Sequence, residues 1–328
     1  MIKFAVIGSN SFSGSNFVRF ILKKGISVDG FSRSEEPNEC FLPYKWEDSQ
    51  NFQFHQADLN KDLKKVVEVI SDRKIDYVVN FAAQSMVAES WVNPVHWFQT
   101  NVVSTIALHE ELRKLSTIKK YVHITTPEVY GSCSGYVNET QSFNPTTPYA
   151  VSRAAADLNL NAYHKAYGFP FVSTRAANVY GPGQQLYRII PKTIMCILNG
   201  EKLYLHGGGK SRRSFIHIDD VSNATYRVAL SGEIGSTYHI ATNDLISIEE
   251  LVNTICKMMD VDFQDHVLSA PERLGKDDAY MLDSSKIREQ LNWDDKIKIG
   301  DGLEGCVQWV LENLEDLKKA PTKYNHKA

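Results

Sequence analysis

The feature that most constrains the fold is the alternation of short apolar segments with longer helical patterns through the first half of the chain. Apolar strands that are separated by helices are typical of a parallel sheet covered on both faces. The sequence therefore predicts an α/β fold with a doubly wound parallel sheet. The predicted strands are Phe4–Ile7, Ile26–Phe31, Phe52–His55, Tyr77–Phe81, Tyr121–Thr125 and Phe171–Thr174. The predicted helices lie near Phe12–Lys24, Asp62–Ser71, Val95–Leu115 and Tyr149–Tyr167.

The first predicted strand leads directly into Gly8-Ser-Asn-Ser-Phe-Ser-Gly14, which is followed by a helical pattern. Gly8 permits a tight turn, and Gly14 lets the helix pack closely on the strand. Such a turn directs the amides at the start of the helix toward a pyrophosphate. Ser11 stands where the more usual motif has its middle glycine. Because the motif follows the first strand of a doubly wound sheet, it predicts a Rossmann-like dinucleotide-binding domain.

The end of the second predicted strand bears on the choice between NAD and NADP. An acidic residue there binds the ribose 2′-hydroxyl, whereas an arginine accommodates a 2′-phosphate. Asp29 falls too early, in the middle of the strand, and Ser32 and Arg33 offer a hydroxyl and a cation where the phosphate would lie. The segment therefore favours NADP over NAD. Asp58 and Leu59, after the third strand, are candidates for contact with the adenine.

The pattern changes after Asn178, where glycine-rich turns separate shorter elements. A strand-like segment, Ser214–Ile218, and a helix from Asp219 to Leu230 are candidates to rejoin the first sheet. We expect residues 1–177, with about 214–243, to form the NAD(P)-binding domain. Residues 178–213 and 244–328 would form a smaller, mixed C-terminal lobe that binds the substrate and closes over the carboxyl ends of the strands.

The composition excludes several classes of protein. The 328 residues carry a net charge of −3, so no basic field points to a nucleic-acid partner. The five cysteines form no CxxC pair, which indicates neither a disulfide framework nor a metal site. No apolar stretch approaches the roughly 20 residues of a membrane helix, and the chain does not open like a secretory signal. We therefore expect a cytoplasmic protein without metal or membrane contact.

The segment Tyr149-Ala-Val-Ser-Arg153 is the candidate catalytic centre. Pro148 suits the first turn of a helix, with Thr146 or Thr147 as its cap. Tyr149 and Arg153 then lie on one face, and a fixed cation beside a phenol favours the phenolate. A tyrosine tuned in this way can take a proton from a sugar hydroxyl while hydride passes to a nicotinamide.

A series of ordered motifs surrounds this segment and covers nearly the whole chain. With these motifs the chain resembles the extended short-chain dehydrogenase/reductases, and among them the dTDP-glucose and GDP-mannose 4,6-dehydratases. The motifs are Gly8–Gly14, Asn80–Ser85, Thr125–Gly131, Tyr149–Arg153, Arg175–Gly183, Arg213–Asp220, Glu272–Asp277 and Leu282–Ile287.

The resemblance implies a nucleotide-sugar 4,6-dehydratase, a lyase that works by internal redox chemistry. Tyr149 would act as acid and base at the sugar C4 hydroxyl, and Thr126 would hydrogen-bond the same region. Glu128 would remove the C5 proton after oxidation at C4 has acidified it. Water then leaves C6, hydride returns to C6, and the product is a 4-keto-6-deoxy sugar.

The resemblance also implies the binding residues. Two arginines suit the diphosphate of a nucleotide sugar because a guanidinium pairs bidentately with phosphate oxygens. The substrate residues would be Gln84, Ser85, Asn178, Arg213 and Arg273. The cofactor residues would be Gly8, Ser11, Phe12, Gly14, Ser32, Arg33, Asp58, Leu59, Ala82, Ala83, Asn101, Thr125, Tyr149 and Arg153.

Three positions depart from the family's pattern. Arg153 replaces a lysine, Pro127 stands where dTDP-glucose dehydratases have an aspartic acid, and Met86 replaces a histidine. Pro127 cannot donate a proton, so loss of water would need Glu128, Tyr149 or a water as acid. The alternatives are a nucleotide-sugar 4-epimerase or reductase, in which Glu128 is dispensable, a UDP-glucuronate decarboxylase type, and a binding protein without activity.

The predicted helices at 95–115 and 149–167 carry apolar residues on more than one face. Packing on the sheet accounts for part of this pattern. In the resembling superfamily the equivalent helices of two subunits form a four-helix contact. We therefore expect a homodimer.

Overall fold

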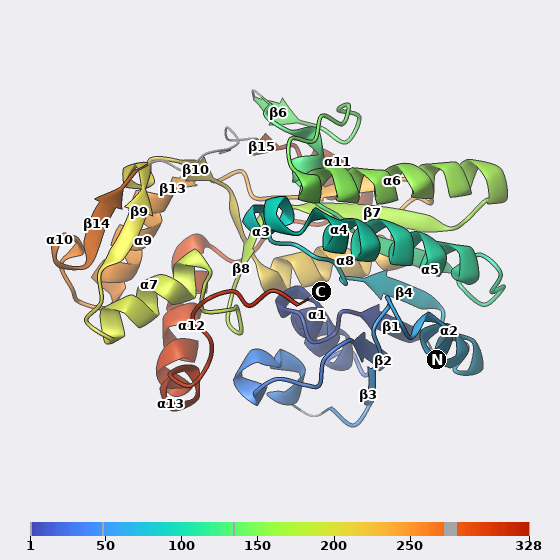
Figure 1. Cartoon of the computed structure of the whole chain (residues 1–328), viewed down its shortest axis with the longest axis horizontal. Helices are drawn as coiled ribbons and strands as arrows, with labels where there is room; N and C mark the ends of the chain where they lie inside the picture. Colours follow the sequence, from blue (N-terminus) through green and yellow to red (C-terminus); the bar gives the residue numbers. More distant parts are fainter. Residues whose placement is uncertain (1, 48, 134, 272–280, 328) are drawn as a thin grey trace.

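The computed structural model describes residues 2–47, 49–133, 135–271 and 281–327 (Figure 1). Its centre is a sheet in the order β12-β7-β5-β4-β1-β2-β3, in which every neighbouring pair is parallel. The order reverses beside β1, which is the switch point where such sheets bind ligands. The doubly wound α/β fold is therefore confirmed. The strands are β1 (Lys3–Ile7), β2 (Ser27–Ser32), β3 (Phe52–Gln56), β4 (Tyr77–Asn80), β5 (Lys120–Ile124), β7 (Phe171–Ala176) and β12 (Thr237–Ile240).

Strand β1 shows why the sheet needs helices on both faces. Phe4 and Val6 pack into one hydrophobic cluster, Ala5 and Ile7 pack into another, and all four are buried. Successive side chains of a strand point to opposite faces, so two apolar layers must cover the sheet. The helices of the first face are α1 (Phe12–Leu22) and α8 (Ile218–Ser231), and those of the second are α2 (Leu63–Asp72), α5 (Thr105–Leu112) and α6 (Pro148–Tyr167).

A second group of elements lies beyond the carboxyl ends of the strands, at the left of Figure 1. It has its own hydrophobic clusters, which contain Ile190, Leu251 and Leu303 from three different helices. A short parallel pair, β9 with β14, lies beside these helices. The elements are α7 (Ile189–Leu198), β9 (Leu203–His206), α9 (Ile248–Met258), α10 (Phe263–His266), β14 (Val267–Ala270), α12 (Ile299–Glu312) and α13 (Leu314–Leu317).

The segment at 214–218 does not join the seven-stranded sheet. Its strand β11 (Phe215–His217) pairs in parallel with β8 (Asn178–Tyr180), which follows β7 after a single residue. The helix α8 that follows does pack on the sheet, through Val221, Ala224 and Val228. The strand that extends the sheet is β12, beside β7. The chain thus leaves the sheet at its carboxyl edge and returns to it only with β12.

The predicted helix at 95–115 is divided into three parts. Helix α4 (Pro94–Phe98) and α5 flank a π-helical segment, Gln99–Ser104. The hydroxyl of Thr105, the first residue of α5, donates to the Thr100 carbonyl of this segment at 2.9 Å. Such segments often lie at functional sites. The remaining elements are α3 (Val87–Val92), β6 (Tyr136–Val137), β10 (Arg212–Arg213), β13 (Ile246–Ser247), β15 (Met281–Leu282), α11 (Ser285–Leu291) and four 3-10 turns at Glu39–Phe41, Pro43–Lys45, Pro127–Tyr130 and Gly207–Gly209.

The cysteines and the helices bear on the expected environment. All five cysteines are free thiols, and four of them are buried. Across the described ranges, no helix combines the length and the apolar character that crossing a membrane requires. Within those same ranges, no group of three or more His, Cys, Asp or Glu side chains is arranged to hold a metal ion.

Candidate active site

The turn between β1 and α1 brings backbone segments unusually close together. Gly8 has a φ of +87°, and a Cβ on it would lie 2.8 Å from the amide nitrogen of Ala82. A Cβ on Gly14 would lie 2.1 Å from the Gly8 carbonyl oxygen. The Ser11 hydroxyl donates to that carbonyl at 2.7 Å and accepts from the Gly14 amide at 3.1 Å, so Ser11 caps α1. Phe12 begins the helix and is buried, and residues 12–15, all described, include no acid. The positive end of the helix dipole is therefore free to face an anion.

The loop after β4 is held in place by Asn101, from the π-helical segment. The Asn101 side chain accepts from the Gln84 amide at 2.8 Å and donates to the Gln84 carbonyl at 2.9 Å. It also donates to the Ser152 hydroxyl at 3.0 Å, which connects the loop to α6. Asn101 thus positions the loop, rather than offering a free amide. The other predicted residues of this loop are Ala82, Ala83 and Ser85, of which Ser85 is exposed.

Tyr149 lies in the first turn of α6 because the preceding residues start the helix there. Thr147 is the N-cap, and its hydroxyl accepts from the Ala150 amide at 3.1 Å. Pro148 occupies the first helical position, where its missing N–H costs no hydrogen bond. Tyr149 is 8% exposed, and Arg153, one turn further along, is 2% exposed. The two residues therefore share one face of α6, as predicted.

The Thr126–Glu128 segment forms a 3-10 turn after β5, at the same edge of the sheet. Thr126 is its N-cap and accepts from the Glu128 amide at 3.3 Å, and Pro127 is its first residue. The departure at Pro127 therefore has a local role, since proline favours the start of a helical turn. A hydrogen bond joins Thr126 to Tyr149, and the charge of Glu128 also acts on Tyr149. Thr126, Glu128 and Tyr149 thus meet at one point.

The ionisation of Tyr149 differs from the expectation. Burial raises the pKa of Tyr149 above its ordinary value, and the negative charge of Glu128 adds to the increase. The positive charges of Arg153 and Arg188 and the hydrogen bond with Thr126 lower the pKa, but by less. The cation lowers the pKa as expected, but the loss of solvation on burial is the larger effect. The phenol is therefore held neutral.

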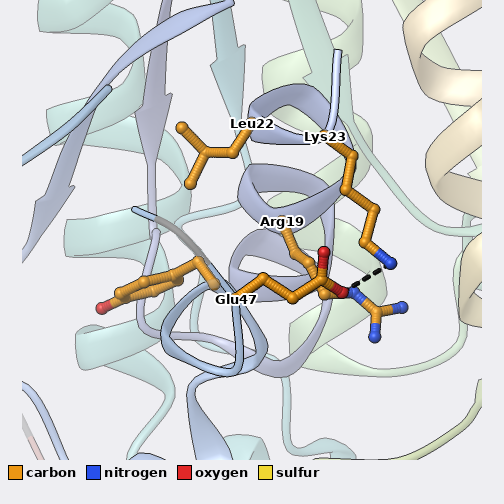
Figure 2. Close-up of a pocket in the computed structure, with 5 residues that line it drawn as sticks. Arg19, Leu22, Lys23 and Glu47 are labelled. Atoms are coloured by element: carbon orange, nitrogen blue, oxygen red, sulfur yellow. Dashed lines mark ion pairs between the residues drawn. The ribbon is translucent and has the colours of Figure 1, made fainter. Parts of the chain in front are cut away.

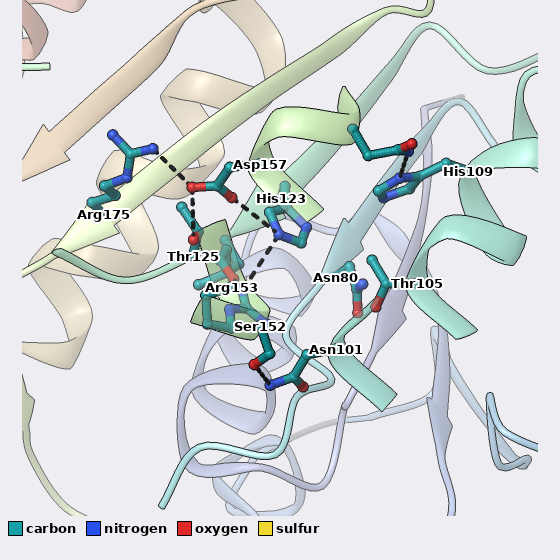
Figure 3. Close-up of polar contacts among 12 residues, drawn as sticks. Asn80, Asn101, Thr105, His109, His123, Thr125, Ser152, Arg153, Asp157 and Arg175 are labelled. Atoms are coloured by element: carbon teal, nitrogen blue, oxygen red, sulfur yellow. Dashed lines mark hydrogen bonds and ion pairs between the residues drawn. The ribbon is translucent and has the colours of Figure 1, made fainter. Parts of the chain in front are cut away.

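A buried polar cluster lies beneath this face of α6 (Figure 3). The Arg153 guanidinium donates to the Ile124 carbonyl, and its Nη2 lies 3.5 Å from His123 Nε2. Asp157, the next residue on this face of the helix, accepts from Arg175 at 2.8 Å. The Asp157 carboxylate also lies 3.5 Å from His123 Nε2. Two guanidinium groups and one carboxylate thus lie in an interior that is almost closed to solvent, and only the Arg175 guanidinium pairs with the carboxylate.

The residues after β2 are arranged largely as predicted. Asp29 lies inside the strand, is 1% exposed, and pairs with His55 at 2.8 Å and Arg73 at 3.2 Å. Both oxygens of its carboxylate are therefore engaged by these two side chains. The Ser32 hydroxyl accepts from the Asn10 amide at 2.9 Å, and Arg33 donates to the Lys327 carbonyl at 3.1 Å. Ser32 and Arg33 thus stand at the carboxyl end of β2.

Three further predicted cofactor residues direct their side chains into the protein. Asp58 accepts from the Asn60 amide at 2.9 Å, and Leu59 is buried in the cluster on the second face. The Thr125 hydroxyl donates to Asp157 at 3.1 Å. Contacts of these residues with a cofactor remain predictions, and they would involve backbone atoms or a change of partner.

The predicted substrate residues are divided between two places: Gln84 and Ser85 lie in the loop after β4, and Asn178 and Arg213 lie beyond the sheet. Asn178 and Arg213 line one small pocket together with Ala177, Ser214 and Leu282. The Asn178 amide donates to the Ser214 carbonyl at 3.3 Å, and Arg213 donates to the Arg212 carbonyl at 2.9 Å. Arg273, the second predicted phosphate ligand, lies outside the described residues.

A larger surface pocket beside α1 contains none of the predicted site residues (Figure 2). Its lining includes Arg19, Leu22 and Tyr44, and an ion pair of 2.5 Å joins Lys23 to Glu47 across it. Both members of the pair are nearly half exposed, so the interaction contributes little to stability. We assign no role to this pocket.

Sequence reasoning missed three charged or titratable groups near the site. Asp157 could have been found, because it lies four residues after Arg153 on the same helix. His123 required the register of β5 against its neighbours, which the sequence does not provide. Arg188 acts on Tyr149 from the start of α7, on the other lobe, and no local pattern connects the two.

The glycine turn at the switch point, together with the Tyr149–Arg153 pair on α6, defines the class as the extended short-chain dehydrogenase/reductases. The model of the GDP-mannose 4,6-dehydratase family matches residues 6–306. The chain belongs to this family.

Similar proteins include enzymes of several names. A dTDP-glucose 4,6-dehydratase of Xanthomonas campestris is 30% identical over 331 residues, which are 95% of this chain and 94% of that protein. A trifunctional UDP-glucose 4,6-dehydratase/UDP-4-keto-6-deoxy-D-glucose 3,5-epimerase/UDP-4-keto-L-rhamnose-reductase of Arabidopsis thaliana is 32% identical over 81% of this chain. The match spans only 40% of the length of that plant protein.

Solved structures agree with the fold. The dTDP-glucose 4,6-dehydratase DesIV of Streptomyces venezuelae, with NAD bound, has a TM-score of 0.88 and 30% identity, covering 96% of this chain and 98% of that one. A UDP-glucuronic acid 4-epimerase of Bacillus cereus, with UDP-glucuronic acid and NAD, has a TM-score of 0.86 and 26% identity, covering 95% and 99%.

Proposed function

We propose that this chain is a nucleotide-sugar 4,6-dehydratase that forms a 4-keto-6-deoxy sugar nucleotide. The observation that carries the proposal is the interaction of Tyr149 with both Thr126 and Glu128, of which Tyr149 and Thr126 are buried and Glu128 is partly exposed. A carboxylate beside the tyrosine suits an elimination, because oxidation and hydride return alone require no base at C5. The family match and the dehydratases among its relatives support the same reaction.

Each residue then has a distinct task. As the phenolate that the charge of Arg153 favours, Tyr149 takes the proton of the C4 hydroxyl while the C4 hydrogen leaves as hydride, and Thr126 orients that oxygen. The C4 ketone acidifies C5, and Glu128 takes the C5 proton. The C6 hydroxyl leaves with a proton as water, and hydride and a proton are added at C6 and C5. Because Pro127 cannot donate, the acid at C6 is Glu128, Tyr149 or a water.

A nicotinamide dinucleotide suits the turn at the switch point. Side chains at Gly8 or Gly14 would collide with backbone atoms, so the turn leaves room for a close approach by a pyrophosphate. When bound, the nicotinamide supplies the acceptor and donor of hydride. We propose that Gly8–Gly14 and the loop containing Ala82 and Ala83 hold this cofactor.

The preference between NADP and NAD is the finer part of this proposal. Ser32 and Arg33, at the end of β2, support NADP, whereas the solved relatives named above hold NAD. Titration of the protein with each cofactor would measure the ratio of the two Kd values. We expect Arg33→Ala to weaken NADP binding by about tenfold and NAD binding by less. Equal losses for both cofactors would contradict the NADP assignment.

We propose that the second lobe binds the nucleotide diphosphate through Asn178, Arg213 and Arg273. In this division, residues 1–177 and about 214–243 form the cofactor domain, and 178–213 and 244–328 form the sugar-nucleotide lobe. The hydrophobic clusters around α7, α9 and α12 support the division, as does the return of β12 to the sheet. Helix α11 departs from it, because Ile287 and Leu291 pack into the cluster on the first face of the sheet. A location in the cytoplasm remains a prediction that fractionation of cells would test.

We further propose a homodimer formed through α3, α4 and α6. Large apolar side chains stand exposed on these helices, including Trp91, Val92, Val95 and Leu158. An apolar surface of this kind is typical of a protein–protein contact. Light scattering at working concentration should give twice the mass of the chain, and a monomer would contradict the proposal.

A panel of UDP-, dTDP-, GDP- and CDP-sugars tests the main reaction. Mass spectrometry should find one sugar nucleotide that loses a single water when incubated with the protein and cofactor. The absence of an acid at Pro127 favours a second candidate, a 4-epimerase, which would change the retention of the product without changing its mass. Loss of carbon dioxide would instead indicate the decarboxylase type, and binding without any turnover would contradict an enzymatic role.

A further inference from the structure

The interior behind Tyr149 holds Arg153 in an uncommon way. Within the described residues, its guanidinium finds its acceptors on β5: the Ile124 carbonyl and, at 3.5 Å, the Nε2 of His123. In that same part of the chain, no carboxylate oxygen lies within ion-pair distance of Arg153, although Asp157 follows it by one helical turn. One oxygen of the Asp157 carboxylate is instead engaged by Arg175 at 2.8 Å and by Thr125 at 3.1 Å, and the other lies 3.5 Å from His123 Nε2.

His123 can act here only as a neutral group. It is fully buried, and burial together with the positive charges of Arg153 and Arg175 and the neighbouring His109 holds its pKa well below the ordinary range. Its Nδ1 lies 3.2 Å from the Tyr121 hydroxyl. If Nδ1 carries the proton, Nε2 presents a lone pair toward Arg153.

We propose that His123 is a positioning residue, which holds the Arg153 guanidinium through a neutral acceptor. Because Arg175 engages the Asp157 carboxylate, the charge of Arg153 is not neutralised there. The positive charge of Arg153 therefore acts on Tyr149. A carboxylate in the place of His123 would neutralise the guanidinium, and an apolar residue would leave Nη2 with one acceptor fewer. The arrangement also accounts for the departure from lysine, because only a guanidinium has separate nitrogens for the strand and for the site. The proposal rests on Tyr149 being the acid and base of the reaction.

The test is a titration of Tyr149 that needs no sugar substrate. The ultraviolet difference between the full-length protein and its Tyr149→Phe variant reports the phenolate of this residue alone. We expect His123→Leu to move that titration to higher pH, and His123→Gln, which keeps a neutral acceptor, to restore it. These variants leave unchanged the other charged and titratable groups that face Tyr149 and His123. Those groups are Arg153, Asp157, Arg175, Arg188, Glu128, His109 and Tyr121.

A double-mutant cycle with Arg153→Lys separates positioning from stability. In the wild-type background His123→Leu should lower turnover by about tenfold. Both acceptors are reached by the same Arg153 nitrogen, Nη2, and a lysine is shorter than an arginine. In the Arg153→Lys background, where the ammonium is expected to lose its contact with His123, the same change should lower turnover by less than about twofold. An equal loss in both backgrounds, or a Tyr149 titration unmoved by His123→Leu, would overturn the proposal. A protein without dehydratase activity would still allow the titration, so the two proposals can fail separately.

A different observation concerns the end of the described chain, which runs back from α13 toward the start of α1 (Figure 1). The Lys327 carbonyl accepts from Arg33 at 3.1 Å and from Gln84 at 2.7 Å. These two residues follow β2 and β4, which flank β1 in the sheet. One carbonyl group that bridges them therefore lies over the end of β1, where the turn at Gly8 begins.

The neighbouring residues fix the segment further. The His326 ring stacks on Trp97 with centroids 5.0 Å apart, and its Nε2 lies 2.8 Å from His96. The Tyr324 ring meets Tyr187 edge to face at 5.7 Å. These contacts join the segment to both lobes, since Tyr187 precedes α7 and Trp97 lies on α4.

We infer that residues 324–327 compete with the dinucleotide for Arg33 and for the space between Arg33 and Gln84, so that the cofactor must displace this segment in order to bind. The inference rests on the proposed cofactor site. If the segment occupies the site for most of the time, only a small fraction of the protein has an open site. The apparent Kd of the cofactor is then multiplied by the reciprocal of that fraction. The segment would thus set the cofactor concentration at which the enzyme becomes active.

Calorimetric titration of NAD and NADP into the full chain and a chain ending at Ala320 tests this inference. We expect the shortened chain to bind cofactor about tenfold more tightly. His326→Ala, which removes the stack on Trp97 and leaves Arg33 and Gln84 intact, should shift the Kd in the same direction by a smaller factor. Equal or weaker binding by both variants would overturn the inference and would indicate a lid that closes over the bound cofactor. Failure of all three proteins to bind would instead contradict the cofactor site.

Discussion

The two sides of the active site are built differently. On the sheet side, Tyr149 and Thr126 are buried, and each belongs to a helical turn whose cap and first residue are fixed by the local sequence. On the lobe side, Asn178 is exposed and Arg213 is partly exposed. The sheet side is thus constrained by packing, and the lobe side by very little. Chemistry shared by a family suits the first kind of structure, and choice of substrate suits the second.

The electrostatics follow the same division. Arg153, Asp157 and Arg175 lie in an interior where charges are weakly screened, and the titration of Tyr149 responds to the charge of Arg153. Arg213 lies near solvent, where salt and water weaken its interactions. Changes on the sheet side should therefore alter the rate of the reaction, whereas changes on the lobe side should alter affinity for the sugar nucleotide.

Replacing Tyr149 by phenylalanine should have the largest effect. Removal of the acid and base is expected to lower kcat by about 10³-fold, while KM and the unfolding midpoint change little. Steady-state kinetics on the substrate found in the panel, with circular dichroism melting of both proteins, would measure this. A loss confined to KM would place Tyr149 with the binding residues and would remove the contrast between the two sides.

Glu128→Gln should break the reaction at a defined step. The amide cannot take the C5 proton, so exchange of that proton with deuterated solvent should stop and turnover should fall by about 10²-fold. Cofactor and sugar-nucleotide binding should stay close to those of the wild type. Nuclear magnetic resonance of the substrate in D₂O would follow the exchange, and exchange at the wild-type rate would exclude Glu128 from this step.

Arg213→Ala tests the lobe side, and the adjacent Arg212→Ala is its matched control. Loss of a charge-assisted contact to a diphosphate should raise KM by about tenfold, with kcat within about twofold of the wild type. Arg212 is exposed and donates to the Leu245 carbonyl, away from the small pocket, so its loss should leave both constants unchanged. Equal effects of the two variants would mean that only general positive charge matters there.

The same division explains how much could be predicted. Gly8–Gly14 and the cap of α6 depend on a few neighbouring residues, so the sequence indicated them correctly. The neighbour of β8 could not be predicted, because a strand of three residues carries no signal for its partner. The raised pKa of Tyr149 was missed because burial depends on the whole fold, and Arg188 because it approaches from the other lobe. The features that could not be predicted therefore all depend on contacts between residues far apart in the sequence, both at the site and in the pairing of strands.

The smallest effect should appear in stability on the sheet side, as a dependence on pH. Burial lowers the pKa of His109 to about 3, whereas a histidine in the unfolded chain titrates near 6.5. Below about pH 6.5 the unfolded state therefore binds a proton at this histidine and the native state does not, so the free energy of unfolding falls as the pH drops. The decrease is up to about 1.4 kcal/mol per pH unit for each such group. The decrease ends near pH 3, where the native ring also binds the proton. Urea unfolding would measure the free energy of unfolding at about pH 7.5 and about pH 5.5, on either side of the pKa of the unfolded chain. Between these two pH values the free energy of unfolding should decrease less for His109→Gln than for the wild type. The control variant, at the exposed His206, is His206→Gln, which should show the same decrease as the wild type. Equal decreases in all three proteins would mean that His109 takes up a proton in the folded state.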